Sequence, residues 1–131
     1  MITVWTNGCF DILHRGHIEL FKYAKSMGDR LIVGIDSDER VRLLKGKDRP
    51  YNNQNIRVEF LNAISYIDDV VVFGSEEELR YSIQMYSPEV IVVGSEYKFK
   101  DVIGKEYSKN VSFFERVEGY STSFILGGEN E

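Results

Sequence analysis

Near its start the chain reads Gly8-Cys9-Phe10-Asp11-Ile12-Leu13-His14-Arg15-Gly16-His17, and both histidines of the protein lie in this run, three residues apart. An apolar, β-branched segment, Ile2 to Thr6, leads into the run, and a helical pattern, Ile18 to Met27, follows it. The run is therefore predicted to be a loop that joins a strand to a helix. Such a junction presents unpaired backbone N–H groups and the positive end of the helix dipole, which bind anions.

The rest of the chain repeats this alternation of strand and helix. Runs rich in β-branched and aromatic residues predict five strands that are buried on both faces: Ile2–Thr6, Leu31–Ile35, Val70–Phe73, Val90–Val93 and Val111–Phe114. Helical patterns lie between them, and alternating strands and helices form right-handed crossovers around a parallel sheet. We therefore expect an α/β fold, a single Rossmann-like, doubly wound, five-stranded parallel sheet with helices on both faces. Ligands of such sheets bind beyond the carboxyl ends of the strands, where the loop at residues 8–17 falls.

Three helical segments carry recognisable signals. The first ends at Gly28, a residue that commonly terminates helices. In a later one, a core face is predicted from the apolar positions Ile56, Phe60, Leu61, Ile64 and Ile67. Ser75 followed by Glu78 is a capping box, which predicts a helix that begins there and ends before Ser87-Pro88.

Composition limits the possible functions. With 131 residues, of which 43% are hydrophobic, we expect one domain over residues 1–131, with a polar tail at 127–131. The net charge of -5 argues against sequence-independent nucleic-acid binding, which needs an excess of basic residues on one face. The sequence shows neither a signal-peptide pattern nor an apolar stretch long enough to span a bilayer, and its single cysteine, Cys9, rules out an internal disulfide. We therefore expect a cytoplasmic protein without a membrane partner.

The loop at residues 8–17 has the features of a phosphate site. Gly8 and Gly16 allow a ligand to approach the backbone, and the imidazoles of His14 and His17 can donate hydrogen bonds to phosphate oxygens. Two alternatives remain open from the residues alone. The histidines could serve only as polar residues at a helix start, or Cys9, Asp11 and the two histidines could bind a metal, although their spacing matches no usual zinc pattern. Cys9 is predicted to be a small buried residue rather than a nucleophile.

Two further polar groups point to phosphate chemistry. Lys45, Lys47 and Arg49 form a basic cluster in a predicted loop, either a solvated surface or part of a ligand site. Ser121, Thr122 and Ser123 are predicted to start a last short helix, where they either cap it or bind phosphate. Arg57 stands early in a predicted helix, where its charge opposes the dipole, and this disfavours a purely structural role.

These motifs together resemble the cytidylyltransferase-like nucleotidylyltransferases. Residues 8–17 match the pattern G-x-F-D-x-x-H-x-G-H, and Arg116-Val117-Glu118-Gly119-Tyr120-Ser121-Thr122-Ser123 is similar to a segment of glycerol-3-phosphate cytidylyltransferases. Leu44-Lys45-Gly46 with Arg49-Pro50 and Arg57, and Gly94-Ser95-Glu96-Tyr97 with Gly104-Lys105-Glu106, resemble the heptose-phosphate adenylyltransferases. The resemblance covers nearly the whole chain.

The resemblance implies transfer of AMP or CMP from ATP or CTP to a phosphorylated sugar of the heptose-phosphate type, with release of pyrophosphate and no covalent intermediate. It further implies Mg²⁺ on the triphosphate, a homodimer and a part in cell-surface polysaccharide biosynthesis. The implied catalytic residues are His14, His17, Lys45 and Arg116. The implied nucleotide-binding residues are Asn7, Gly8, Cys9, Phe10, Gly16, Lys47, Gly94, Glu96, Ser121, Thr122 and Ser123. The implied acceptor-binding residues are Asp11, Arg57 and Tyr97, and no protein ligand to a metal is expected.

Alternatives exist for the function. One is a glycerol-3-phosphate cytidylyltransferase that makes CDP-glycerol, which the segment at residues 116–123 favours. Another is a noncatalytic nucleotide-binding module, or one half of a bifunctional enzyme whose kinase is a separate chain. A hydride-transferring Rossmann domain is disfavoured, because the first loop lacks the G-x-G-x-x-G pattern.

Overall fold

The computed structural model describes residues 1–115. Over this range the strands are β1 (Thr3–Gly8), β2 (Arg30–Asp36), β3 (Asp69–Phe73), β4 (Val90–Gly94) and β5 (Asn110–Phe114). The helices are α1 (Arg15–Ser26), α2 (Asp38–Lys45), α3 (Gln54–Asn62) and α4 (Glu76–Tyr86), with single 3₁₀ turns η1 (Ser95–Tyr97) and η2 (Lys105–Tyr107). All five predicted strands are confirmed, each within two residues at its ends. Burial on both faces was predicted for all of them, but β3 and β5 are only partly buried because they lie at the edges of the sheet.

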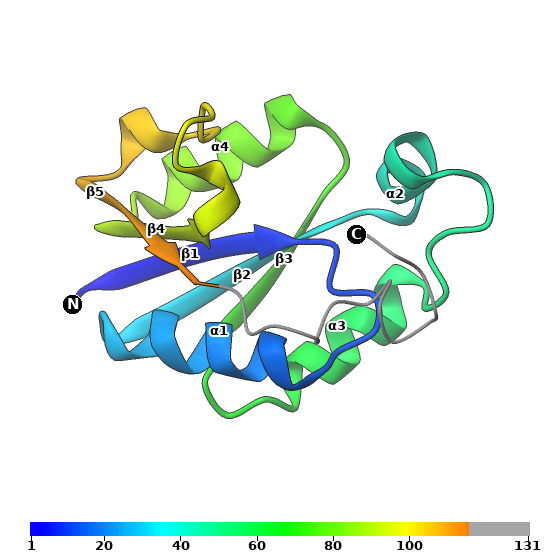
Figure 1. Ribbon diagram of the computed structural model, residues 1–131, viewed down its shortest axis with the longest axis horizontal. Coiled ribbons are helices and arrows are strands. Elements are labelled where there is room, and N and C mark those ends of the chain that lie inside the picture. The colour runs from blue at the N-terminus through cyan, green and yellow to red at the C-terminus, as the bar shows by residue number, and fades with distance from the viewer. Residues whose placement is uncertain (116–131) are drawn as a thin grey trace.

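The strands form one parallel sheet in the order β3-β2-β1-β4-β5. Helices α1 and α3 cover one face and α4 covers the other (Figure 1). The predicted doubly wound fold is confirmed. Because the chain winds in one direction from β1 to β3 and in the other from β4 to β5, the carboxyl ends of β1 and β4 flank the point where the winding reverses.

Each face of the sheet has its own apolar core, and strand alternation divides the residues between them. Leu31, Val33 and Ile35 of β2 pack with Phe21 of α1 and Leu61 of α3. On the opposite face, the contacts join Trp5, Ile32, Phe73, Leu79, Ile83 and Ile91. The loop after β1 thus rises from a strand that is fixed on both sides.

Two helix predictions need correction. Lys45 was expected in a loop but is the last residue of α2, a helix with a single buried residue, Val41. In α3 the predicted core positions Ile56 and Phe60 are 37% and 51% exposed, whereas Arg57 is fully buried beside Leu61. The reason is that a network of hydrogen bonds, described below, holds the Arg57 face of α3 against the sheet.

The predicted capping box at the start of α4 is confirmed in its first half. Ser75 Oγ accepts a hydrogen bond from the backbone N–H of Glu78 at 3.1 Å. The Glu78 carboxylate accepts from Gly74 N at 2.6 Å, one residue before the position that a standard capping box would use.

Candidate active site

A cavity of about 550 Å³ lies at the carboxyl edge of the sheet. Its walls come from the ends of β1, β2, β3 and β4, the start of α1, the end of α2 and residues 96–103. The sequence-predicted residues that line it are Asn7, Gly8, Cys9, Phe10, His14, Gly16, His17, Lys45, Gly94, Glu96 and Tyr97. Segments far apart in the chain therefore meet at the edge where ligands of doubly wound sheets bind.

The two histidines occupy the start of α1 as a reciprocal cap. His14 is the N-cap residue, and its Nδ1 accepts a hydrogen bond from Gly16 N at 3.1 Å. His17 Nδ1 accepts from the backbone N–H of His14 at 3.2 Å. The two rings stack with centroids 3.8 Å apart. The capping role considered from the sequence is therefore real, and it places both rings side by side at the cavity wall.

These capping bonds determine which ring nitrogen carries the proton. A nitrogen that accepts a backbone N–H cannot itself be protonated, so Nδ1 is unprotonated in both rings. A neutral imidazole then carries its hydrogen at Nε2. Each ring consequently has an N–H donor on the side away from the helix backbone, which is the group needed to bind a phosphate oxygen.

Phe10 packs against His17 and helps to hold its ring in place. It has a φ of 48°, a left-handed conformation that is uncommon for an aromatic residue. Its ring is 7% exposed and makes edge contacts with His17 and Phe21, at centroid distances of 5.3 and 5.1 Å. Backbone strain at one loop residue thus allows a buried ring to anchor His17 to the core.

Cys9 lines the cavity as an uncharged thiol. Burial raises the pKa of the Cys9 thiol above its usual value, and the nearby charge of Lys45 only partly opposes this. A thiol with a raised pKa is a poor nucleophile at neutral pH. The influence of Lys45 on Cys9 also indicates that the ammonium group lies near the loop after β1.

Asp11 and Arg57 lie behind the cavity wall and do not line it. Asp11 is 2% exposed, and its carboxylate accepts hydrogen bonds from Tyr51 N and Asn52 N at 2.7 and 2.8 Å. Arg49 Nε lies 3.4 Å from the same carboxylate. Asp11 therefore holds the segment before α3 against the loop after β1.

Arg57 joins four separate segments through its guanidinium. Its Nη1 donates to the carbonyls of Cys9 and Asp36 at 3.0 and 2.7 Å. Its Nη2 donates to the Asp38 carboxylate at 2.8 Å, and its Nε donates to Asn52 O at 3.0 Å. These bonds assign Arg57 a structural role, contrary to the expectation from the helix dipole. Direct contact of Asp11 or Arg57 with an acceptor stays a prediction that this geometry does not favour.

Some of the site residues predicted from the sequence do not line the cavity within the described residues. Lys47 is exposed in the turn after α2 and does not line the cavity. Arg116, Ser121, Thr122, Ser123 and the tail at 127–131 lie outside the described residues, so their predicted roles stay predictions. Sequence reasoning also missed cavity residues, chiefly Asp36, Arg40 and Lys100. The signal for Asp36 was its position directly after the predicted strand Leu31–Ile35, at the edge where ligands bind, whereas Arg40 lies in α2 and had no such signal.

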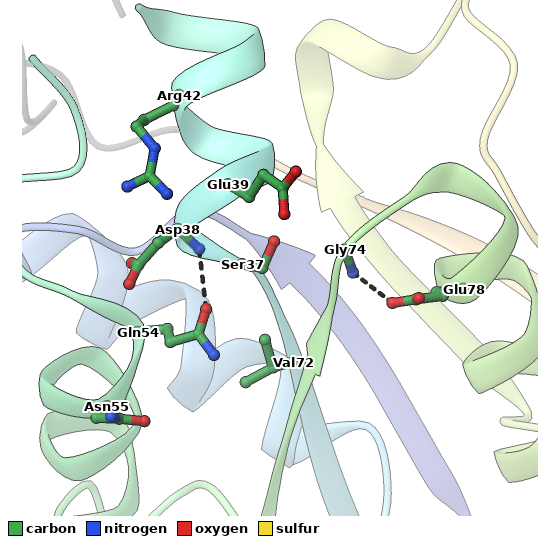
Figure 2. Close-up of a pocket in the computed structure, with 9 residues that line it drawn as sticks. All are labelled: Ser37, Asp38, Glu39, Arg42, Gln54, Asn55, Val72, Gly74 and Glu78. Atoms are coloured by element: carbon green, nitrogen blue, oxygen red, sulfur yellow. Dashed lines mark hydrogen bonds between the residues drawn. The ribbon is translucent and has the colours of Figure 1, made fainter. Parts of the chain in front are cut away.

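A second, more open depression of about 590 Å³ lies between α2, α3 and the start of α4 (Figure 2). Its polar lining includes the acidic side chains of Asp38, Glu39 and Glu78, with Arg42 at its edge. Gln54 accepts a hydrogen bond from Asp38 N at 3.0 Å across it. None of the site residues predicted from the sequence is among the described residues that line it, and its acidic character is unsuited to a triphosphate.

Residues 1–115 contain no cluster of three or more His, Cys, Asp or Glu side chains that could hold a metal ion. Within the same range, no helix is long and apolar enough to cross a membrane. The acidic and basic residues that line the cavity are the bases His14, His17, Arg40, Lys45 and Lys100 and the acids Asp36, Glu96 and Asp101, together with Cys9 of the loop after β1.

Comparison with known proteins gives consistent matches. The family model described as cytidylyltransferase-like matches residues 5–125. Curated relatives include the bifunctional protein HldE of Helicobacter pylori strain J99, 45% identical over 123 residues that make up 94% of this chain and 26% of that protein. The protein of the same name from Wolinella succinogenes is 47% identical over 124 residues, again 94% of this chain and 26% of the relative. The chain thus spans about a quarter of the length of these relatives.

A solved structure has the same fold. The crystal structure of the lipopolysaccharide core biosynthesis protein from Thermoplasma volcanium GSS1 superposes with a TM-score of 0.69 at 29% identity. The match covers 92% of this chain and 99% of that one.

Proposed function

The chain belongs to the cytidylyltransferase-like family of nucleotidyltransferases, and from this premise we propose that it transfers AMP from ATP to a sugar phosphate of the heptose-phosphate type, releasing pyrophosphate. The observation that carries the proposal is the stacked pair His14 and His17, which cap α1 and line one cavity with Lys45. Similarity to the HldE proteins supports the heptose-phosphate type of acceptor.

This transfer needs a protein that positions the two substrates and stabilises the negative charge of the transition state, and it needs no protein nucleophile. An oxygen of the acceptor phosphate forms a bond to the α-phosphorus of the triphosphate, and the bond to the β-phosphate bridging oxygen breaks. Pyrophosphate leaves with the electron pair of that bond. Negative charge therefore grows on the bridging oxygen in the transition state, and donors aimed at it accelerate the step.

The residues of the cavity suit this task. His14 and His17 would donate Nε2–H to the α- and β-phosphates, with His17 the principal donor in the transition state. Lys45 would neutralise charge on the α-phosphate. The backbone N–H groups at the start of α1 add fixed partial positive charge. Arg116, Ser121 and Thr122 are proposed, from the sequence, to hold the departing β- and γ-phosphates.

Magnesium fits this site only as part of the nucleotide. Mg²⁺ prefers oxygen ligands, and although Asp36, Glu96 and Asp101 line the cavity, the described residues contain no group of three or more acidic, His or Cys side chains that could hold the ion. The ion would supply charge screening that lets two polyanions approach. Assembly as a homodimer and location in the cytoplasm, both predicted from the sequence, remain proposals.

The test is a pyrophosphate-release assay with Mg²⁺ in which ATP and CTP are each combined with heptose 1-phosphate and glycerol 3-phosphate. We expect turnover with ATP and heptose 1-phosphate. Turnover only with CTP and glycerol 3-phosphate would replace the proposal by the cytidylyltransferase alternative. Nucleotide binding without pyrophosphate release for any pair would indicate a noncatalytic module.

His17→Gln tests the role of the histidine itself. Glutamine at this helix position can still accept the backbone N–H of His14, as in an ordinary capping box, so the fold is retained. The transition-state donor is displaced, and we expect turnover to fall at least about 100-fold. Lys22→Gln, at an exposed position on the same helix, is the matched control. A His17→Gln protein with full activity would refute the mechanism.

A further inference from the structure

Asp36 and Arg40 form a polar pair in the cavity that the mechanism above does not use. Asp36 is the last residue of β2, and Arg40 lies in the first turn of α2. Arg40 Nε donates to Asp36 Oδ1 at 2.8 Å, and the two side chains are only 20% and 15% exposed. Both residues line the cavity.

The pair is held in place from two sides. The Arg40 guanidinium lies over the ring of Phe73, with its carbon 5.8 Å from the ring centroid. The backbone of Arg40 is fixed as well, because its N–H donates to the N-cap residue Ser37 at 3.2 Å. A side chain that is already ordered loses little entropy when it binds a ligand.

The pair keeps unused hydrogen-bonding capacity. Among residues 1–115, the hydrogen bonds of Arg40 involve only its Nε and its backbone, which leaves the N–H groups of Nη1 and Nη2 for a ligand. Within the same range, the Asp36 carboxylate accepts a hydrogen bond through Oδ1 alone. In the part of the chain that the structure describes, neither side chain has a buried polar atom that lacks a partner, so Nη1 and Nη2 of Arg40 and Oδ2 of Asp36 reach the cavity or solvent.

The charge of the pair indicates the kind of group it suits. Carboxylate and guanidinium sum to zero, so a phosphate near them would meet repulsion from Asp36 as well as attraction to Arg40. Neutral hydroxyl groups suit both partners, since they donate to a carboxylate and accept from a guanidinium. The phosphates have a better place at His14, His17 and Lys45.

We propose that Asp36 and Arg40 bind hydroxyl groups of the acceptor sugar and thereby select polyhydroxylated sugar phosphates over glycerol phosphate. This inference rests on the proposed transfer to a sugar phosphate. With the nucleotide phosphates at the histidines and Lys45, the acceptor phosphate would lie beside the α-phosphate, opposite the leaving pyrophosphate, and Asp36 and Arg40 line the same cavity, where they can meet the sugar hydroxyl groups. Phe73 and Leu79, which also line the cavity, offer apolar surface to the C–H groups of the sugar.

The experiment compares Asp36→Asn and Arg40→Gln with matched controls on the exposed side of the same helix, Glu39→Gln and Arg42→Gln. The KM for heptose 1-phosphate should rise about 10- to 100-fold in each pair variant, the usual loss when a hydrogen bond to a charged group is removed. The KM for ATP should stay within about 2-fold. Any activity with glycerol 3-phosphate should change much less, and the controls should match the wild type.

Other outcomes would overturn the inference. A rise in the KM for ATP equal to that for the sugar phosphate would assign the pair to the nucleotide, and an unchanged KM for the sugar phosphate would exclude the pair from recognition. If the wild type releases no pyrophosphate, the proposed function fails separately, and calorimetric titration with heptose 1-phosphate then decides. Binding by the wild type that weakens in both pair variants supports the inference, and equal or absent binding refutes it.

Discussion

Replacing Arg57 by methionine should destabilise the protein strongly without acting first on substrate binding. Methionine fills a similar volume but removes all four hydrogen bonds that the guanidinium makes to Cys9, Asp36, Asp38 and Asn52. Breaking a buried ion pair costs about 3–5 kcal/mol, and each buried carbonyl that loses its donor adds about 1–3 kcal/mol. Because water can reach some of these groups after relaxation, we take about 4 kcal/mol as the minimum loss.

This loss is a large share of the 5–15 kcal/mol typical of a domain. With an unfolding entropy of about 2.1 cal/mol/K per residue, 4 kcal/mol corresponds to a fall in Tm of about 15 °C for a chain of this size. The assay is urea unfolding followed by circular dichroism. Arg57→Lys keeps the charge and part of the hydrogen bonding, so it should lose about half as much. Arg42→Met, on the exposed face of α2, should change the free energy of unfolding by no more than about 0.5 kcal/mol.

The same variants separate the two roles considered for Arg57. If Arg57 contacted the acceptor, Arg57→Lys would raise the KM for the acceptor while leaving the unfolding midpoint nearly unchanged. An Arg57→Met protein within about 1 kcal/mol of the wild type would refute the reasoning from the hydrogen-bond network.

Three further predictions concern the sheet, an ion pair and the cysteine. Gly34→Ala should lower the free energy of unfolding in urea by about 1–3 kcal/mol, since its Cβ would lie 2.5 Å from Trp5 Cζ2. Gly74→Ala is the control, because its Cβ would meet only side-chain atoms that can move. Equal stabilities of the two variants would contradict this prediction. Burial raises the pKa of Asp68, but hydrogen bonds from Lys25 and Leu31 N outweigh it and leave the pKa lowered. Asp68 therefore stabilises the fold above its unfolded pKa of about 4, and Asp68→Asn should have a lower free energy of unfolding than the wild type at pH 7. This difference should shrink as acid protonates Asp68 in the folded protein, and a difference that does not change with pH would count against the prediction. Because burial raises the pKa of the Cys9 thiol, the native thiol should react slowly with iodoacetamide, and Cys9→Ser should keep turnover within about 3-fold of the wild type. A fall in turnover of about 100-fold would point to a chemical role for Cys9.

The sheet was predictable because its strands carry their own signal. Short runs such as Leu31–Ile35 are apolar on both faces, which identifies a strand of a parallel sheet without any tertiary information. Helix α2 gave no such signal. The helix has only eight residues and three apolar positions, of which Val41 is buried while Leu43 and Leu44 are 79% and 62% exposed, so the pattern is too short to identify a helix with a core face.

The predicted core face of α3 was partly wrong for a different reason. The apolar pattern selected Leu61 correctly but also Ile56 and Phe60, which are exposed. The second buried position is Arg57, whose partners lie on the loop after β1, at the end of β2, in α2 and before α3. Burial of an arginine depends on acceptors supplied by distant segments, and a local pattern contains no information about them.

The residues of the candidate site likewise fall into those that the sequence predicted and those that it did not. The loop with His14 and His17 was located because a strand, a glycine-flanked loop and a helix follow one another along the sequence. Asp36 and Arg40 were missed, since an acid and a base four residues apart look like an ordinary helix-surface pair until the sheet order places them at the cavity.

During synthesis β1 leaves the ribosome before β2 and β4, the two strands that flank it in the finished sheet. Its second edge stays open until β4, which begins at Val90, has been synthesised, a delay of several seconds at usual translation rates. During this time Trp5 lacks Ile91 and Ile83, its packing partners in the finished core. A prematurely terminated chain would carry both histidines and still be inert, an aggregation-prone substrate for chaperones and proteases rather than a partly active enzyme.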